Sequence, residues 1–113
     1  MLAKVNRIAR AEDFRSTVRR GRRAGLEHAV VYVAERGDSS PTRFGFIVSK
    51  AVGNSVVRHR MARRLRAVGH ELLPSYPTGR DVIVRALPGS PEVSWSILHG
   101  EISDGLERST GKR

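Results

Sequence analysis

Arginine is the residue type in this chain that offers the most chemistry. The 113 residues include 18 arginines and three lysines, and a guanidinium is a planar, permanently charged fork that binds phosphate oxygens in pairs. Between Ser39 and His70 there is no aspartate or glutamate. Five cations crowd into the nine residues 58–66, namely Arg58, Arg60, Arg63, Arg64 and Arg66. This pattern indicates binding to the phosphates of a folded RNA or DNA.

The residue types that usually carry catalysis are few and poorly spaced. The chain has no cysteine, and none of its four histidines (His28, His59, His70, His99) lies four residues from another, so no zinc site is predicted. Adjacent acids on a helix, such as Glu12 and Asp13, point about 100° apart and do not converge as a two-metal nuclease requires. P-loop and G-x-S-x-G motifs are absent. We therefore expect no catalytic residue in this chain and assign no metal ligand.

Composition favours one soluble domain over residues 1–113. The mass is 12.5 kDa, 39% of the residues are hydrophobic, and the net charge is +10. Residues 1–70 hold 16 basic and five acidic side chains, an imbalance that calls for a polyanionic partner. No apolar run reaches the roughly 18 residues of a membrane span, and no signal peptide is visible at the start. We expect a cytoplasmic protein with no membrane partner, and loose tails at 1–6 and 108–113.

The elements that must position these residues follow the order α-β-β-β-α-β-α. A first helix is predicted to begin near the acids at 12–13 and to stop at Gly21, which is expected to form a left-handed cap. Strands are predicted at 22–26, 28–34, 43–49 and 80–86, with 28–34 and 43–49 joined as a hairpin across the turn at 37–41. A long helix follows 53–54 and ends near residue 73, and a last helix covers 94–107. The fold class is an α/β (α+β) sandwich with one mixed four-stranded sheet.

The long helix has one apolar face and one cationic face. Asn54 or Ser55 is its predicted N-cap. At 100° per residue a narrow stripe is expected to be buried, formed by Val57, Met61, Leu65, Val68 and Leu72. The opposite face carries Arg60, Arg63, Arg66, His59 and His70, with Arg58 and Arg64 on the two shoulders. A solvated helix that is merely basic remains the alternative, but such helices usually carry compensating glutamates.

The aromatic residues are ambiguous on sequence alone. Tyr32 and one of Phe44 and Phe46 could share a face of the sheet, because side chains alternate along a strand. Phe14 and both strand phenylalanines are equally consistent with an ordinary core. Trp95 lies on the apolar seam of the last helix and is expected in the core with Leu98, Ile102 and Leu106. Two glycines, at 100 and 105, should weaken that helix.

A longer motif adds a family resemblance. Ser49-Lys50, then Gly53-Asn54-Ser55-Val56-Val57-Arg58-His59-Arg60, then Arg63-Arg64-Leu65-Arg66 resembles the signature S-K-x-x-G-N-A-V-x-R-N-R-x-K-R-x-x-R of the bacterial ribonuclease P protein subunit. The resemblance extends to Arg7, to residues 12–14 and to residues 81–83. It departs from the family at three positions: His59 stands for an asparagine, Ala62 for a basic residue and Val18 for a frequent aromatic.

The resemblance implies a role beside a catalytic RNA. In that family the RNA subunit removes the 5′ leader of precursor tRNA using Mg²⁺, which is bound mainly by the RNA, and no organic cofactor or protein partner is required. The residues implied to contact the RNA subunit are Lys50, Asn54, Arg58, His59, Arg60, Arg63, Arg64 and Arg66. Those implied to line a leader-strand cleft are Arg7, Phe14, Val18, Tyr32, Phe44 and Phe46. A left-handed βαβ crossover is also implied, against the usual right-handed preference.

Two alternatives remain open at this point. A ribosomal-type RNA-binding protein would share the basic helix but would have no role in tRNA processing. An autonomous metal nuclease would need a carboxylate cluster that the sequence does not suggest.

Overall fold

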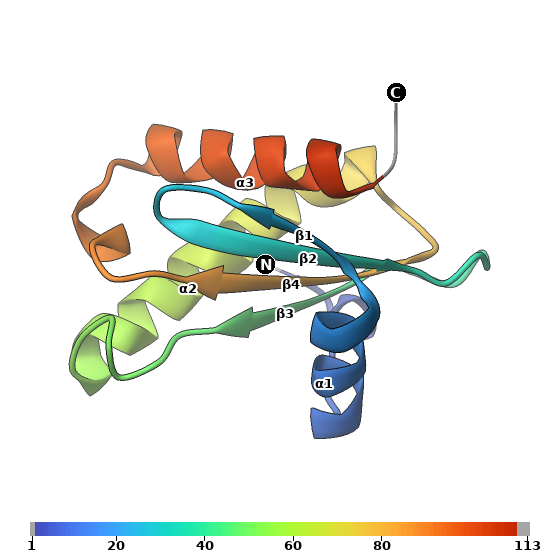
Figure 1. Cartoon of the computed structure of the whole chain (residues 1–113), viewed down its shortest axis with the longest axis horizontal. Helices are drawn as coiled ribbons and strands as arrows, with labels where there is room; N and C mark the ends of the chain where they lie inside the picture. Colours follow the sequence, from blue (N-terminus) through green and yellow to red (C-terminus); the bar gives the residue numbers. More distant parts are fainter. Residues whose placement is uncertain (1, 111–113) are drawn as a thin grey trace.

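A computed structural model describes residues 2–110 of the chain. The elements occur in the predicted order (Figure 1). The helices are α1 (Ala11–Arg20), α2 (Ser55–Leu72) and α3 (Trp95–Ser109), and the strands are β1 (Arg22–Gly25), β2 (Ala29–Glu35), β3 (Arg43–Ile47) and β4 (Arg80–Ala86). Short 3₁₀ turns lie at Lys4–Asn6, Leu73–Ser75 and Ser90–Glu92. Among the helices of residues 2–110, none combines the length and the apolar character needed to cross a membrane.

The four strands form one mixed sheet in the order β1-β2-β4-β3. β2 pairs antiparallel with both β1 and β4, and β3 pairs parallel with β4. The predicted hairpin of β2 and β3 is therefore wrong, because β4 lies between them. The turn at 37–41 reverses the direction of the chain, but it does not determine whether β3 or β4 pairs with β2. β4 has five of its seven residues buried, and a strand covered on both faces is favoured at the centre of a sheet.

The connection from β3 through α2 to β4 is a parallel crossover. In Figure 1 both strands point the same way, β4 lies above β3, and α2 runs behind the sheet, which makes the crossover left-handed. This handedness was implied by the family resemblance and is opposite to the general preference.

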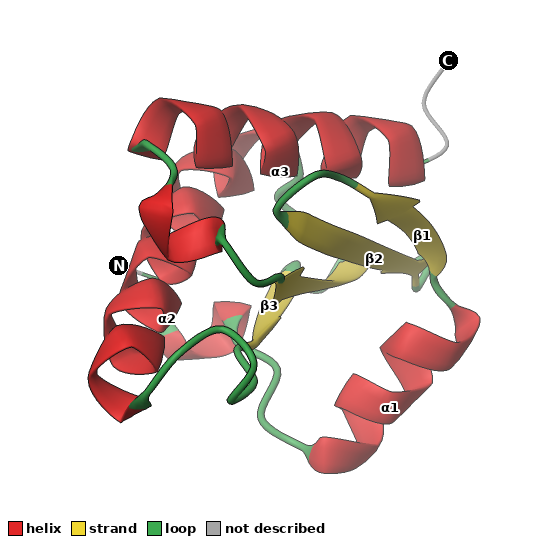
Figure 2. Ribbon diagram, turned by 60° about the vertical axis from the view of Figure 1, so that its left-hand side comes forward, coloured by secondary structure: helices red, strands yellow, loops and turns green. Residues whose placement is uncertain are grey.

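The two faces of the sheet carry different helices (Figure 2). α2 and α3 pack on one face, where Val31, Val33, Val82 and Val84 join the apolar sides of both helices. α1 lies against one end of the other face, where Ile8, Val30, Tyr32 and Ile83 form a smaller apolar cluster with Phe14 and Val18 at its edge. The predicted sandwich is confirmed. On its own face of the sheet, α1 forms one wall of a groove.

The predicted stripe of α2 is confirmed as its buried side. Met61, Leu65, Val68 and Leu72 are all buried in the main core, and Val57 at the first turn is half-buried. Asn54, rather than Ser55, is the N-cap, and its side-chain oxygen accepts a hydrogen bond of 3.0 Å from the Val57 amide. The cationic side of α2 therefore points away from the sheet.

Three local predictions are wrong. Gly21 ends α1 in an extended conformation (φ −73°), and glycine is needed there because a Cβ atom would lie 2.6 Å from the Thr17 carbonyl oxygen. Trp95, which was predicted in the core, is 39% exposed. It is the first residue of α3, one turn before the buried Leu98, and its ring lies 5.9 Å from that of His99.

The third wrong prediction concerns the tails. Leu2 packs in the main core, and the Asn6 side chain donates a hydrogen bond to the Thr42 carbonyl at 2.9 Å. At the other end α3 continues to Ser109, and both Ser109 and Thr110 are buried. These segments are fixed by packing and by hydrogen bonds that composition does not reveal. Residues 1 and 111–113 lie outside the described part.

Candidate nucleic-acid interface

The outer side of α2 carries cations with no acidic partner. We name Arg58, His59, Arg60, Arg63 and Arg66 the α2 ridge. His59, Arg60 and Arg63 are exposed, and Arg58 and Arg66 are half-buried. Within residues 2–110 no ridge residue forms a salt bridge with a carboxylate. The four arginines of the ridge therefore keep their charge for another molecule.

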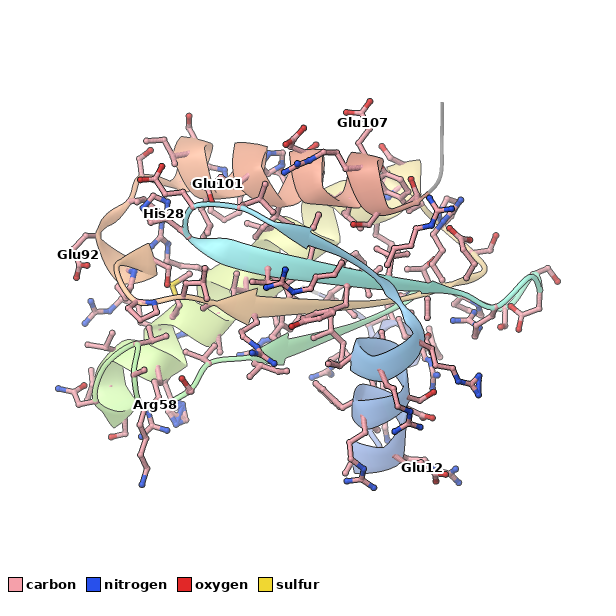
Figure 3. All side chains as sticks on the ribbon, viewed as in Figure 1. Glu12, His28, Arg58, Glu92, Glu101 and Glu107 are labelled. Atoms are coloured by element: carbon pink, nitrogen blue, oxygen red, sulfur yellow. The ribbon has the colours of Figure 1, made fainter. Side chains whose placement is uncertain are left out.

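The N-terminal end of α2 orients one ridge residue. The Arg58 Nε atom donates a 3.2 Å hydrogen bond to the Gly53 carbonyl, and Figure 3 shows this side chain at the lower end of α2. A small hollow of about 250 Å³ beside it is bordered by Phe46, Ser55, His59 and Ala62 among others. Lys50 and Asn54, both exposed, lie just before the helix. The sequence-predicted contact residues 50–60 are thus gathered at one end of α2.

Arg64 differs from the ridge. Its guanidinium donates to the Val93 carbonyl at 2.8 Å and to the Pro91 carbonyl at 3.5 Å. These bonds tie α2 to the segment that precedes α3. The contact between Arg64 and RNA stays a prediction. In the structure the Arg64 side chain also stabilises the packing of α2 against that segment.

A groove runs between α1 and the sheet. Its volume is about 370 Å³, and its lining, which we name the α1 groove, comprises Phe14, Arg15, Val18, Arg19, Ile47 and Arg85. Phe14 and Val18 are half-buried, as predicted from their shared helix face. Phe14 packs directly over Gly45, where a Cβ atom would lie 2.6 Å from its ring. Arg7 is exposed and borders a separate hollow with Lys4 and Ile8.

Tyr32 lies on the sheet face beneath α1 but offers little surface. The residue is only 5% exposed, and the Arg85 guanidinium carbon lies 5.7 Å from the centre of its ring. Tyr32 therefore supports Arg85 and leaves no open ring face for a base.

The placement of Phe44 and Phe46 in the cleft is wrong. The register pairs Gly45 with Ile83 and Ile83 with Tyr32, so those three residues share the α1 face. Phe44 and Phe46 alternate to the opposite face, where they stack on each other at 6.1 Å and pack beneath α2. The β3–β4 register decides which of the alternating β3 side chains face α1, and the sequence does not reveal that register.

Sequence reasoning missed three cations of the α1 groove, namely Arg15, Arg19 and Arg85. The signal for Arg85 was available, since it lies two residues after Ile83 in an apolar strand and so shares the face of Ile83. Arg15 and Arg19 are four residues apart and share one side of α1, which lies next to the side that carries Phe14 and Val18 and borders the same groove.

Other arginines of the chain form ion pairs with acids of the same chain. Asp81 is nearly buried and accepts hydrogen bonds from both Arg36 and Arg43. Arg43 also approaches Asp13 at 3.4 Å, which links α1 to β3. The hydrogen bond to Asp81 raises the pKa of Arg43 above its usual value. The Arg43–Asp13 ion pair therefore helps to fix the position of α1 against the sheet.

One cluster of metal-ligand types lies elsewhere. Glu27, His28 and Glu101 bring their ligand atoms within 4.8 Å of one another. The His28 Nδ1 atom is 2.7 Å from a Glu101 carboxylate oxygen, and the His28 amide donates to the other oxygen at 2.8 Å. Figure 3 shows this contact at the β1–β2 turn against α3, away from Arg58. It serves as a link between the sheet and α3.

A small α/β domain with an unpaired cationic helix face and a cation-lined groove belongs to the class of nucleic-acid-binding proteins. The family model for Ribonuclease P matches residues 2–110. The chain belongs to the ribonuclease P protein family.

Similar proteins agree with this assignment. The Ribonuclease P protein component of Clavibacter michiganensis is 45% identical over 109 residues and 96% of each chain, and that of Rhodococcus opacus is 46% identical over 96% of this chain and 91% of its own. The solved RNase P protein of Staphylococcus aureus is 25% identical with a TM-score of 0.79, covering 93% of this chain and 95% of its own. The RNase P protein from Thermotoga maritima, at 22% identity and a TM-score of 0.79 over 90% and 96% of the two chains, shares the fold.

Proposed function

We propose that this chain binds the RNA subunit of ribonuclease P through the α2 ridge and the leader of precursor tRNA through the α1 groove. Membership of the family makes it a subunit of the ribonuclease P holoenzyme, which cleaves tRNA precursors. The observation that carries the proposal is the α2 ridge, whose cations have no carboxylate partner among the described residues.

The ridge suits the backbone of a folded RNA. Arg60, Arg63 and Arg66 follow one another at three-residue intervals along a rigid helix. Each phosphate that they neutralise would release a condensed counterion, which favours binding most strongly at low salt. Lys50 and the Asn54-capped end of α2 would extend the contact, since a helix N-terminus favours anions.

The α1 groove suits a single strand. Three cations border it, and Phe14 supplies an apolar wall. Single-stranded RNA binds to grooves that combine backbone charge with apolar faces. With Val18 in place of an aromatic and Tyr32 covered, base stacking contributes less here than charge, and leader binding should depend weakly on sequence.

Catalysis belongs to the RNA in this proposal. The sequence has no acid between Ser39 and His70, so the α2 ridge offers no carboxylate to hold Mg²⁺, and the metal is bound mainly by RNA phosphates. The chain contributes fixed positive charge near those phosphates, which reduces the concentration of Mg²⁺ needed. Because the substrate is precursor tRNA, the proposed location is the cytoplasm.

The test is reconstitution from purified parts. Protein, ribonuclease P RNA and precursor tRNA are mixed at low Mg²⁺, and release of the 5′ leader is followed. We expect cleavage only when protein and RNA subunit are both present. No stimulation at any Mg²⁺ concentration would contradict the proposal, and cleavage by protein alone would place the catalyst in the chain.

A further inference from the structure

Arg85 occupies a position that packing alone does not explain. In the sheet register it pairs with Val30 of β2 and Ile47 of β3, so it stands between two aliphatic residues on the α1 face. An aliphatic side chain would complete this apolar row. An arginine here must lose water from part of its guanidinium, which costs free energy unless a partner replaces the water.

No such partner is present in the described part of the chain. The Arg85 Nε atom is buried without a hydrogen-bond acceptor, and Arg85 forms no salt bridge with an acid of residues 2–110. Its one recorded contact is with the face of the Tyr32 ring. That contact holds the guanidinium beneath α1 and fixes its direction.

The rest of the guanidinium borders the α1 groove. The other charged residues of the lining are Arg15 and Arg19 on α1, both exposed, and the lining contains no acid. A ligand that enters the groove therefore meets cations from the helix on one side and from β4 on the other. Such a site fits a phosphodiester, whose anionic oxygens would supply the missing acceptors.

We propose that Arg85, seated on Tyr32, binds a backbone phosphate of the leader strand in the α1 groove. This inference rests on the proposed leader-binding role of the groove. According to this inference, the holoenzyme distinguishes precursor tRNA from mature tRNA mainly through a residue of β4, and not through an aromatic residue of α1.

The test compares holoenzymes reconstituted with wild-type protein, Arg85→Met and Arg85→Lys. Methionine suits the apolar row and removes only the charge, whereas lysine keeps the charge without the planar fork. Dissociation constants are measured over a range of salt for mature tRNA and for precursor tRNA with a ten-nucleotide leader. Arg22→Gln is the matched control, because Arg22 is exposed on β1, is not part of the groove lining and forms no salt bridge with an acid of the described residues.

For Arg85→Met we expect precursor affinity to fall about 5- to 10-fold, as for a lost charge-assisted hydrogen bond, with mature tRNA unaffected. The slope of log K against log salt should decrease by about 0.7, the value for one phosphate of a single strand. Arg85→Lys should keep the wild-type slope, and Arg22→Gln should match wild type. Thermal melting checks that each variant is folded.

Two results would count against the inference in different ways. If wild type prefers precursor tRNA and Arg85→Met keeps both the preference and the slope, Arg85 does not bind the leader, while the role of the groove stands. If wild type binds precursor and mature tRNA equally, the groove is not a leader site, and the role of Arg85 fails with it.

Discussion

Individual arginines in this protein differ in whether they touch a carboxylate of the same chain. Arg36, Arg43, Arg80 and Arg108 pair with carboxylates of the same chain. The arginines of the α2 ridge have no such pair among residues 2–110. Arg60 and Arg64 are like charges four residues apart on α2, an arrangement that destabilises a helix by a few tenths of a kcal/mol, so the cationic side of α2 is better suited to binding than to stability.

Removing two ridge cations tests this distinction. We expect Arg60→Ala with Arg63→Ala to weaken binding to ribonuclease P RNA and to flatten the slope of log K against log salt by about 0.7–0.9 for each lost phosphate contact. Arg22→Ala with Arg108→Ala is the control, since it removes the same charge from β1 and α3. An unchanged slope in the ridge variant would mean that Arg60 and Arg63 face water in the complex.

His28 makes stability depend on pH. The hydrogen bond that the His28 ring donates to the Glu101 carboxylate raises the pKa of His28 above 6.5, more than partial burial lowers it. The charged form is therefore favoured in the folded state, and its contribution is complete below about pH 6.5 and is lost as pH rises through the raised pKa. Melting temperatures between pH 5.5 and 9 should show wild type more stable than Glu101→Gln at the acid end, with the difference shrinking as pH increases.

The control for this prediction is His59→Gln, which removes an exposed histidine that has no acidic partner in the described residues. A gap between wild type and Glu101→Gln that stays constant across the pH range would show that the His28–Glu101 contact does not titrate.

At the scale of elements, the two glycines of α3 have opposite roles. A Cβ atom at Gly100 would meet nothing within 4 Å, whereas one at Gly105 would lie 2.7 Å from the Val31 side chain and 2.9 Å from that of Leu26. Only Gly105 is needed for the close approach of α3 to the sheet.

Urea denaturation should separate the two glycines. Gly100→Ala should raise the free energy of unfolding by about 0.5–1 kcal/mol, because alanine is the better helix former. Gly105→Ala should lower it by about 1–3 kcal/mol through overpacking. Equal effects of the two substitutions would contradict the packing of α3 on β2.

The elements could be predicted from the sequence far better than their partners. Strand 80–86 and the start of α2 follow from local signals, namely a β-branched run and the Asn54 cap. The pairing of β3 with β4 depends on contacts between segments more than thirty residues apart, and it alone decides which face Phe44 and Phe46 occupy. The cationic ridge was predictable because it depends only on helix periodicity, whereas the groove depends on the sheet register.

On the scale of the whole molecule, the acids of α3 lie on the side opposite Arg58. Figure 3 shows Glu101 and Glu107 along α3 at one side and Arg58 at the other. Asp104 is also exposed on α3. An RNA that binds the α2 ridge and the α1 groove would therefore leave the outer side of α3 facing away from its phosphates.

The most direct measurement titrates protein into ribonuclease P RNA and precursor tRNA at low Mg²⁺ and records the rate of leader release. Wild type is compared with Arg60→Ala/Arg63→Ala. If the α2 ridge is the surface that recruits the protein to its RNA, the variant should need about tenfold more protein for half-maximal stimulation, consistent with two lost phosphate contacts, and should reach a similar maximal rate. Coincident titration curves would contradict this account.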